Sequence, residues 1–137
     1  CSRSARTPVS APGEPPSALN RASNISRYLW KLSSARGYKV VLRFMPCDVF
    51  SVEPVLRFLN TERGNTEMSW ECQYVLLMWS AQLVMVPFAF GVVCETKGDR
   101  AGLDVIGELV RTCKDLLRSA SKSRDMAAVC LGRLLTR

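Results

Sequence analysis

Residues 70–86 read WECQYVLLMWSAQLVMV, and this stretch decides the fold class. From residue 74 to residue 86 only Ser80 and Gln82 are polar. The spacing of the apolar residues leaves no polar face if the stretch is a helix. A helix with apolar side chains on nearly all sides must be buried, either between other helices or in lipid.

The limits of this helix favour burial in protein. We predict that it begins near Ser69 and that Pro87 ends it. Glu67 and Glu71 would then lie near its N-terminus, where negative charge interacts favourably with the positive end of the helix dipole. A membrane-spanning helix needs roughly 20 predominantly apolar residues. Residues 74–90 fall slightly short of that length and are interrupted by Pro87. We therefore expect no membrane span, and the N-terminus has no signal-peptide pattern.

The rest of the chain repeats a helical pattern. Apolar residues recur at helical spacing in five further segments, which are residues 25–32, 38–45, 52–59, 103–117 and 126–134. No clear alternation of the kind that strands show is present. The sequence therefore predicts an all-α chain of about six helices joined by short links.

Turn and capping residues mark the limits of these helices. Gly37 separates the first from the second, because glycine accepts the left-handed conformation at a helix end, and Pro46 ends the second. Side chains suited to capping precede the third and the last helices, and the candidates are Asp48 or Ser51 and Ser121 or Ser123. We expect Gly107 to let a neighbouring helix approach closely.

Several of these helices need neighbours on two sides. Stacked antiparallel hairpins of the HEAT or armadillo kind, which form an α-solenoid, provide them with repeats of about 40 residues, and a compact bundle is the alternative. Residues 1–20 hold four of the seven prolines and few large apolar residues, so we expect a disordered lead-in followed by a repeat segment over residues 21–137. The absence of an initial Met and of a final cap suggests a fragment.

Charge and cysteine content narrow the class of partner and the compartment. The net charge is +7, but the basic residues are scattered and no run of five like charges occurs. We expect solvated helix faces or an acidic protein partner, and no nucleic acid. The six cysteines form no C-x-x-C pair and are Cys1, Cys47, Cys72, Cys94, Cys113 and Cys130. They indicate free thiols in the cytosol.

The residues that catalysis usually needs are missing. The chain has no histidine, and no phosphate-binding or nucleophile motif occurs. The carboxylate pairs Asp48 with Glu53 and Asp99 with Asp104 are better explained as caps or solvated loop residues. We expect no catalytic residue, no metal site, no cofactor and no enzymatic activity in this segment.

Four large aromatic residues are candidates for anchoring a partner, namely Trp30, Trp70, Trp79 and Phe88. Because each lies on or beside an apolar stretch, packing in the core is the more frequent role of such residues. The pattern alone does not identify which residues contact a partner.

Four segments resemble, in the same order, the tubulin folding cofactor D family of tubulin-specific chaperones. They are RGYK at residues 36–39, VEPVL at 52–56, W-E-x-x-Y-x-L-L-x-W with V-P-F at 70–88, and R-D-x-A-A-V with R-x-x-T-R at 124–137. The resemblance covers about residues 25–137. Ala89 departs from it, because the family usually has an acid after the Pro-Phe pair.

The resemblance implies an N-terminal piece of a longer HEAT/armadillo solenoid. Its expected function is to bind β-tubulin after the cytosolic chaperonin releases it and to help assemble the α/β-tubulin heterodimer. The implied partners are β-tubulin, tubulin folding cofactors E and C, and an Arf-like small GTPase, in an assembly that stimulates GTP hydrolysis by tubulin. The implied location is cytoplasmic and microtubule-associated. A generic helical-repeat adaptor for another protein is the alternative.

Overall fold

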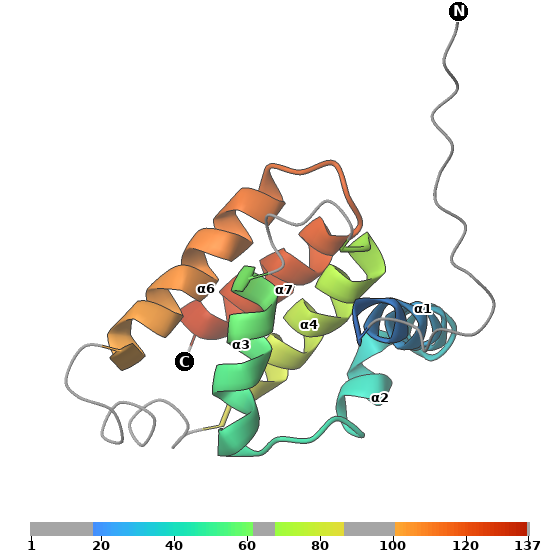
Figure 1. Ribbon diagram of the computed structural model, residues 1–137, viewed down its shortest axis with the longest axis horizontal. Coiled ribbons are helices and arrows are strands. Elements are labelled where there is room, and N and C mark those ends of the chain that lie inside the picture. Colours follow the sequence, from blue (N-terminus) through green and yellow to red (C-terminus); the bar gives the residue numbers. More distant parts are fainter. Residues whose placement is uncertain (1–17, 62–67, 87–100, 137) are drawn as a thin grey trace, which may run out of the picture.

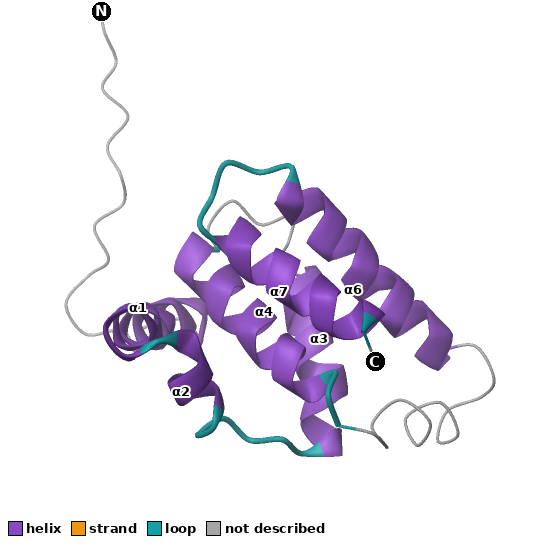
Figure 2. Cartoon of the chain, turned by 180° about the vertical axis from the view of Figure 1, so that it is seen from behind, coloured by secondary structure: helices purple, strands orange, loops and turns teal. Residues whose placement is uncertain are grey.

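The described part of the chain is helical throughout. The computed structural model describes residues 18–61, 68–86 and 101–136 (Figure 1). Within these ranges it contains α-helices and one 3₁₀ turn, and no strand (Figure 2). The elements are α1 (Ala18–Arg36), α2 (Tyr38–Leu42), η1 (Val49–Ser51), α3 (Val52–Thr61), α4 (Trp70–Leu83), α6 (Ala101–Leu117) and α7 (Ser123–Leu135). The all-α prediction is confirmed.

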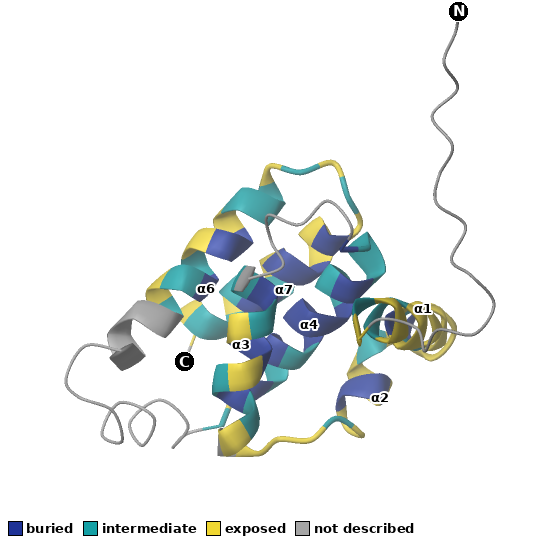
Figure 3. Cartoon of the chain, viewed as in Figure 1, coloured by how far each residue is buried: buried dark blue, intermediate teal, exposed yellow. Residues whose placement is uncertain are grey.

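Helix α4 forms the centre of the molecule. It packs against α1 on one side, α3 on another and α7 on a third, and α6 covers α7 from outside (Figure 1). Leu77, Met78 and Ala81 of α4 have no exposed surface, and the helix is mostly buried along its length (Figure 3). The prediction that this apolar helix is enclosed by other helices is therefore confirmed. Among the described residues, no helix combines the length and hydropathy needed to cross a membrane.

The start of α4 agrees with the prediction and its end does not. The Ser69 hydroxyl accepts a hydrogen bond from the Cys72 N–H at 3.3 Å, which is the N-cap arrangement. The helix ends at Leu83 and does not continue to Pro87. The N–H groups of Met85 and Val86 instead bond to carbonyls three residues earlier, as in a tighter turn. Residues 87–100 lie outside the described residues.

A single glycine joins α1 to α2. Gly37 has a φ of 87°, and its N–H donates to the Ser33 carbonyl at 2.8 Å. Its own carbonyl accepts from the Val40 N–H at 3.1 Å. The predicted role of Gly37 is confirmed. Helix α2 is shorter than expected, because after Leu42 the chain continues as a 3₁₀-like turn before Pro46.

A 3₁₀ turn precedes α3, and the predicted cap of α7 needs correction. The chain enters α3 through η1, where the Ser51 N–H donates to the backbone carbonyl of Asp48 at 3.0 Å. Lys122 occupies the cap position of α7 and makes no side-chain capping bond, while Ser123 is already helical. The Ser121 carbonyl accepts from the Arg124 N–H at 3.1 Å. A backbone turn therefore precedes α7, whereas the sequence predicts that a serine side chain caps this helix.

The role predicted for Gly107 is also wrong. This glycine is exposed on α6, and no heavy atom of the described structure outside its own local backbone lies within 4 Å of the place where a Cβ would stand. The sequence places the repeat segment from residue 21, and α1 begins slightly earlier, at Ala18. Residues 1–17 of the expected lead-in lie outside the described residues.

Helix α1 packs through small polar side chains. Ser26 and Ser33 are buried, whereas Ile25 and Tyr28 are exposed. The Ser33 hydroxyl donates to the Leu29 carbonyl at 2.8 Å, one turn back in the same helix, and lies 3.6 Å from the sulfur of Met78 in α4. The Ser33 hydroxyl is therefore satisfied within α1 and lies against α4, while Ile25, Tyr28 and Leu32 of the apolar stripe face solvent.

The buried cysteines behave as small apolar residues. Cys72, Cys113 and Cys130 are buried free thiols, as predicted, and Cys47 is an exposed one. The hydrogen bond that the Cys130 thiol donates to Cys113, together with burial, raises the pKa of Cys130. Cys1 and Cys94 lie outside the described residues.

Candidate functional site

Two of the predicted aromatic anchors are used within the fold. The rings of Trp30 in α1 and Trp70 in α4 meet edge to face, with 4.9 Å between centroids and 80° between planes. The Lys122 ammonium lies 4.9 Å from the centroid of Trp30 and 5.7 Å from that of Trp70. Such contacts with a cation contribute about 0.5–1 kcal/mol at exposed sites. This cluster fastens α1 to α4 and to the start of α7.

Trp79 also has a structural contact. Its indole N–H donates to the Pro46 carbonyl at 2.8 Å, which ties α4 to the connection between α2 and α3. All three tryptophans are half-buried, so each packs against the fold without entering the fully buried core. Phe88, the fourth predicted anchor, lies outside the described residues.

The polar groups of the described structure hold helices together. The Asn60 amide of α3 donates to the Glu108 carboxylate of α6 at 2.6 Å, and the Thr112 hydroxyl donates to the Asn60 carbonyl oxygen at 3.0 Å. Glu53 pairs with Arg57 on the surface at 2.9 Å. In the described ranges no group of acidic or cysteine side chains is arranged to hold a metal ion. Nothing in this arrangement suggests bond-making chemistry.

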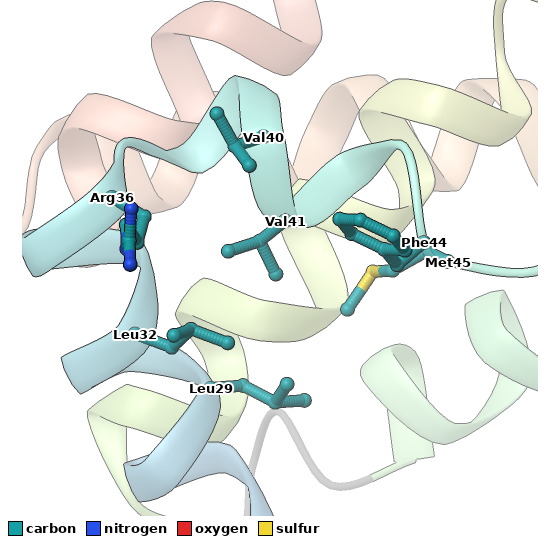
Figure 4. A pocket seen from close by; sticks show the side chains of 7 residues that line it. All are labelled: Leu29, Leu32, Arg36, Val40, Val41, Phe44 and Met45. Atoms are coloured by element: carbon teal, nitrogen blue, oxygen red, sulfur yellow. The ribbon is translucent and has the colours of Figure 1, made fainter.

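A hollow lies between α1 and α2 on the outside of the molecule. It has a volume of about 360 Å³. Leu29 and Leu32 of α1 lie across it from Val41 and Met45 (Figure 4). Its full lining is Leu29, Leu32, Arg36, Val40, Val41, Phe44 and Met45. Arg36 is the one charged residue of this lining, so the hollow is apolar with a cation at its edge.

A second hollow continues the first toward α4. Its volume is about 370 Å³, and it shares Leu29, Phe44 and Met45 with the first. Its other lining residues are Ala22, Ile25, Ser26, Pro46, Phe58, Cys72, Val75, Leu76 and Trp79. We call the two adjoining hollows, defined by these linings, the α1–α2 groove.

Exposed apolar side chains border the α1–α2 groove. Phe44, which lines both hollows, is 84% exposed. Ile25, Leu32 and Val40 are also exposed. Isolated exposed apolar residues are ordinary, whereas a contiguous apolar patch marks a site where another molecule binds.

The wall of the groove that α1 and α2 form is basic. The segment 18–47 contains no aspartate or glutamate, and its six cationic residues are Arg21, Arg27, Lys31, Arg36, Lys39 and Arg43. All six are exposed. The groove therefore combines an apolar lining with positive charge along its α1–α2 wall, which favours an acidic partner.

Comparison with known protein families shows which family the chain belongs to. The family described as "Tubulin-specific chaperone D-like, ARM repeat" matches residues 7–137. The chain belongs to this family. No solved structure gives a significant match. Since the chaperone D-like family is an ARM-repeat family, the α-solenoid interpretation holds and the compact bundle is set aside.

The segments that carry the resemblance to the chaperone D-like family have structural roles. RGYK at residues 36–39 forms the junction of α1 and α2, and the tryptophan-rich segment is the central helix α4. Arg133 of α7 donates to the Ala81 carbonyl at 3.2 Å and to the Gln82 side-chain oxygen at 3.3 Å. It thereby stabilises the C-terminal end of α4 and is engaged inside the fold.

The groove is the part of the site that sequence reasoning missed. A stripe such as Ile25, Tyr28 and Leu32 predicts a helix face without saying whether a neighbour covers it. The available signal was charge, since a stretch from residue 18 to residue 47 without one acid is unusual for a chain in which about a quarter of residues are charged.

Proposed function

We propose that this chain is a partner-binding segment of a tubulin chaperone, which binds β-tubulin and helps assemble the α/β-tubulin heterodimer. Membership of the chaperone D-like ARM-repeat family over residues 7–137 supports this role. The observation that carries it is the basic outer face of α1 and α2, which has no acid between residues 18 and 47. The family resemblance implies that tubulin presents an acidic surface. A basic face would attract such a surface.

The proposed role is that of a scaffold without catalytic residues of its own. In this proposal, the whole assembly and not this chain alone stimulates GTP hydrolysis by tubulin. We further propose tubulin folding cofactors E and C and an Arf-like small GTPase as partners, and the cytoplasm, in association with microtubules, as the location. These proposals rest on the family resemblance.

The test is a binding measurement on the full-length protein that contains this chain. Purified tubulin is captured at about 0.05 M and about 0.5 M salt, because screening over a few ångströms weakens surface electrostatics at the higher concentration. We expect capture at low salt that falls at high salt. Absence of capture at low salt would refute the proposal, and capture of other proteins without tubulin would favour a generic adaptor.

A matched pair of charge reversals locates the contact. The first variant replaces three exposed cations of α1 and α2, Arg27, Lys31 and Lys39, by glutamate. The control makes the same change at two exposed cations of α6, Arg111 and Lys114, and at the exposed Arg118 directly after it. The net charge changes equally in both, so a general charge effect would weaken both alike. We expect the first variant to lose most tubulin binding at low salt and the control to keep it.

A further inference from the structure

We infer that the α1–α2 groove binds an amphipathic helix of a partner protein, with apolar anchors on one face of that helix and acidic residues beside them. The inference rests on the proposed partner-binding role, but it does not require the partner to be tubulin. It names the binding element and the chemistry that recognises it.

The shape of the groove suits a helix. Its two hollows, of about 360 and 370 Å³, share Leu29, Phe44 and Met45, so they lie next to each other along α1. An amphipathic helix in a groove presents successive apolar anchors at i, i+3 or i+4, and i+7. Two successive anchors of such a helix can enter the two hollows.

The border of the groove suits an apolar face. Phe44 lines both hollows and is exposed, as are Ile25, Leu32 and Val40, so covering them would remove apolar surface from water. Phe50 is 92% exposed but does not line the groove. Phe50 therefore offers a control with the same side chain and similar exposure at a different place.

Charge selects the occupant. An acidic helix complements the six cations of residues 18–47, of which Arg36 lines the groove itself. A second copy of the chain would bring the same six cations against them. Residues 1–17 of this chain carry Arg3 and Arg6 against Glu14 and include four prolines, so their charge has the wrong sign and their composition disfavours a helix.

The binding test uses two designed peptides and the full-length protein. Both peptides place leucines at i, i+3, i+4 and i+7 of a helix, and they differ only in flanking residues, glutamate in one and lysine in the other. Fluorescence anisotropy measures the Kd of each. We expect the acidic peptide to bind at least tenfold more tightly at low salt, with a preference that shrinks as salt rises. Equal binding of the two peptides would overturn the inference.

Two matched pairs of variants place the peptide. Phe44→Ala should weaken binding of the acidic peptide about tenfold or more, as loss of an interface anchor does, while Phe50→Ala should leave it unchanged. Arg36→Glu should weaken it at low salt more than Arg111→Glu, an exposed site on α6. Equal effects within either pair would show that the peptide does not occupy the groove.

The alternative occupants give distinct results. A dimer in solution that Phe44→Ala dissociates would show that a second copy covers the groove. Tighter peptide binding after deletion of residues 1–17 would show that the chain's own N-terminal segment covers it. Either result would overturn the inference. Circular dichroism of Phe44→Ala checks that the fold is retained, and the exposure of Phe44 leads us to expect that it is.

The groove inference and the tubulin proposal fail in different ways. If tubulin binds but Phe44→Ala and Phe50→Ala weaken that binding equally, the groove inference is wrong and the tubulin proposal stands. If the acidic peptide binds in the groove but tubulin does not bind, the tubulin proposal is wrong and the groove inference stands.

Discussion

Replacing Leu77 by alanine should destabilise the chain strongly, because this side chain lies in the middle of α4 with no exposed surface. Leucine loses three carbons in this change, which removes about 2 kcal/mol of transfer free energy. Packing from α1, α3 and α7 limits collapse of the space left behind, and that cavity raises the total to about 3–4 kcal/mol. This is a large share of a free energy of unfolding that is about 5–15 kcal/mol for a typical domain.

The assay is urea unfolding followed by far-ultraviolet circular dichroism, with tryptophan fluorescence as a second probe of α4. The control is Leu135→Ala, the same change at a leucine of α7 that is 75% exposed, and its expected cost is below about 0.5 kcal/mol. Both variants should keep the dependence of the free energy on urea concentration unchanged. A difference below about 1 kcal/mol between them would refute the placement of α4 at the centre, since burial is what separates the two sites.

Four further substitutions have predictable outcomes. Gly37→Ala should destabilise by about 1–2 kcal/mol because of the positive φ, whereas Gly107→Ala, at an exposed helical site with free space, should stabilise by up to about 1 kcal/mol in the same urea assay. Thr112→Val should cost about 1–3 kcal/mol in thermal or urea unfolding, since it removes the hydroxyl bonded to Asn60. Burial raises the pKa of Tyr74 above 10.0, so the unfolded chain loses this proton first and stability falls as pH rises above that value. Tyr74→Phe should make this fall less steep in pH-dependent unfolding, and an unchanged slope would contradict the reasoning.

The helices that sequence predicts best are those whose limits depend on local chemistry. The N-cap of Ser69 and the left-handed turn at Gly37 follow from the residues themselves, and both are confirmed. The buried position of α4 also follows locally, because an apolar surface on every side leaves few alternatives. These features need no knowledge of which segment lies beside which.

The features that were predicted wrongly depend on neighbours in space. The stripe containing Ile25 and Tyr28 suggests a buried face, yet both residues are exposed, and α1 contacts α4 through Ser33 against Met78 and Trp30 against Trp70. Gly107 suggests a close approach, but no neighbour lies against it in the described structure. The same limitation hid the α1–α2 groove, which exists because residues from distant parts of the sequence border one surface.

The one-residue connection at Gly37 affects the kinetics of ligand binding, because it fixes the angle between α1 and α2. Two helices separated by a single residue, with hydrogen bonds closing on both sides of it, have almost no freedom to change their mutual angle. The hollow between them is consequently already shaped before an incoming helix arrives, and little ordering entropy is lost on contact. Association should then follow a single kinetic phase whose rate rises linearly with ligand concentration, without a slow isomerisation step.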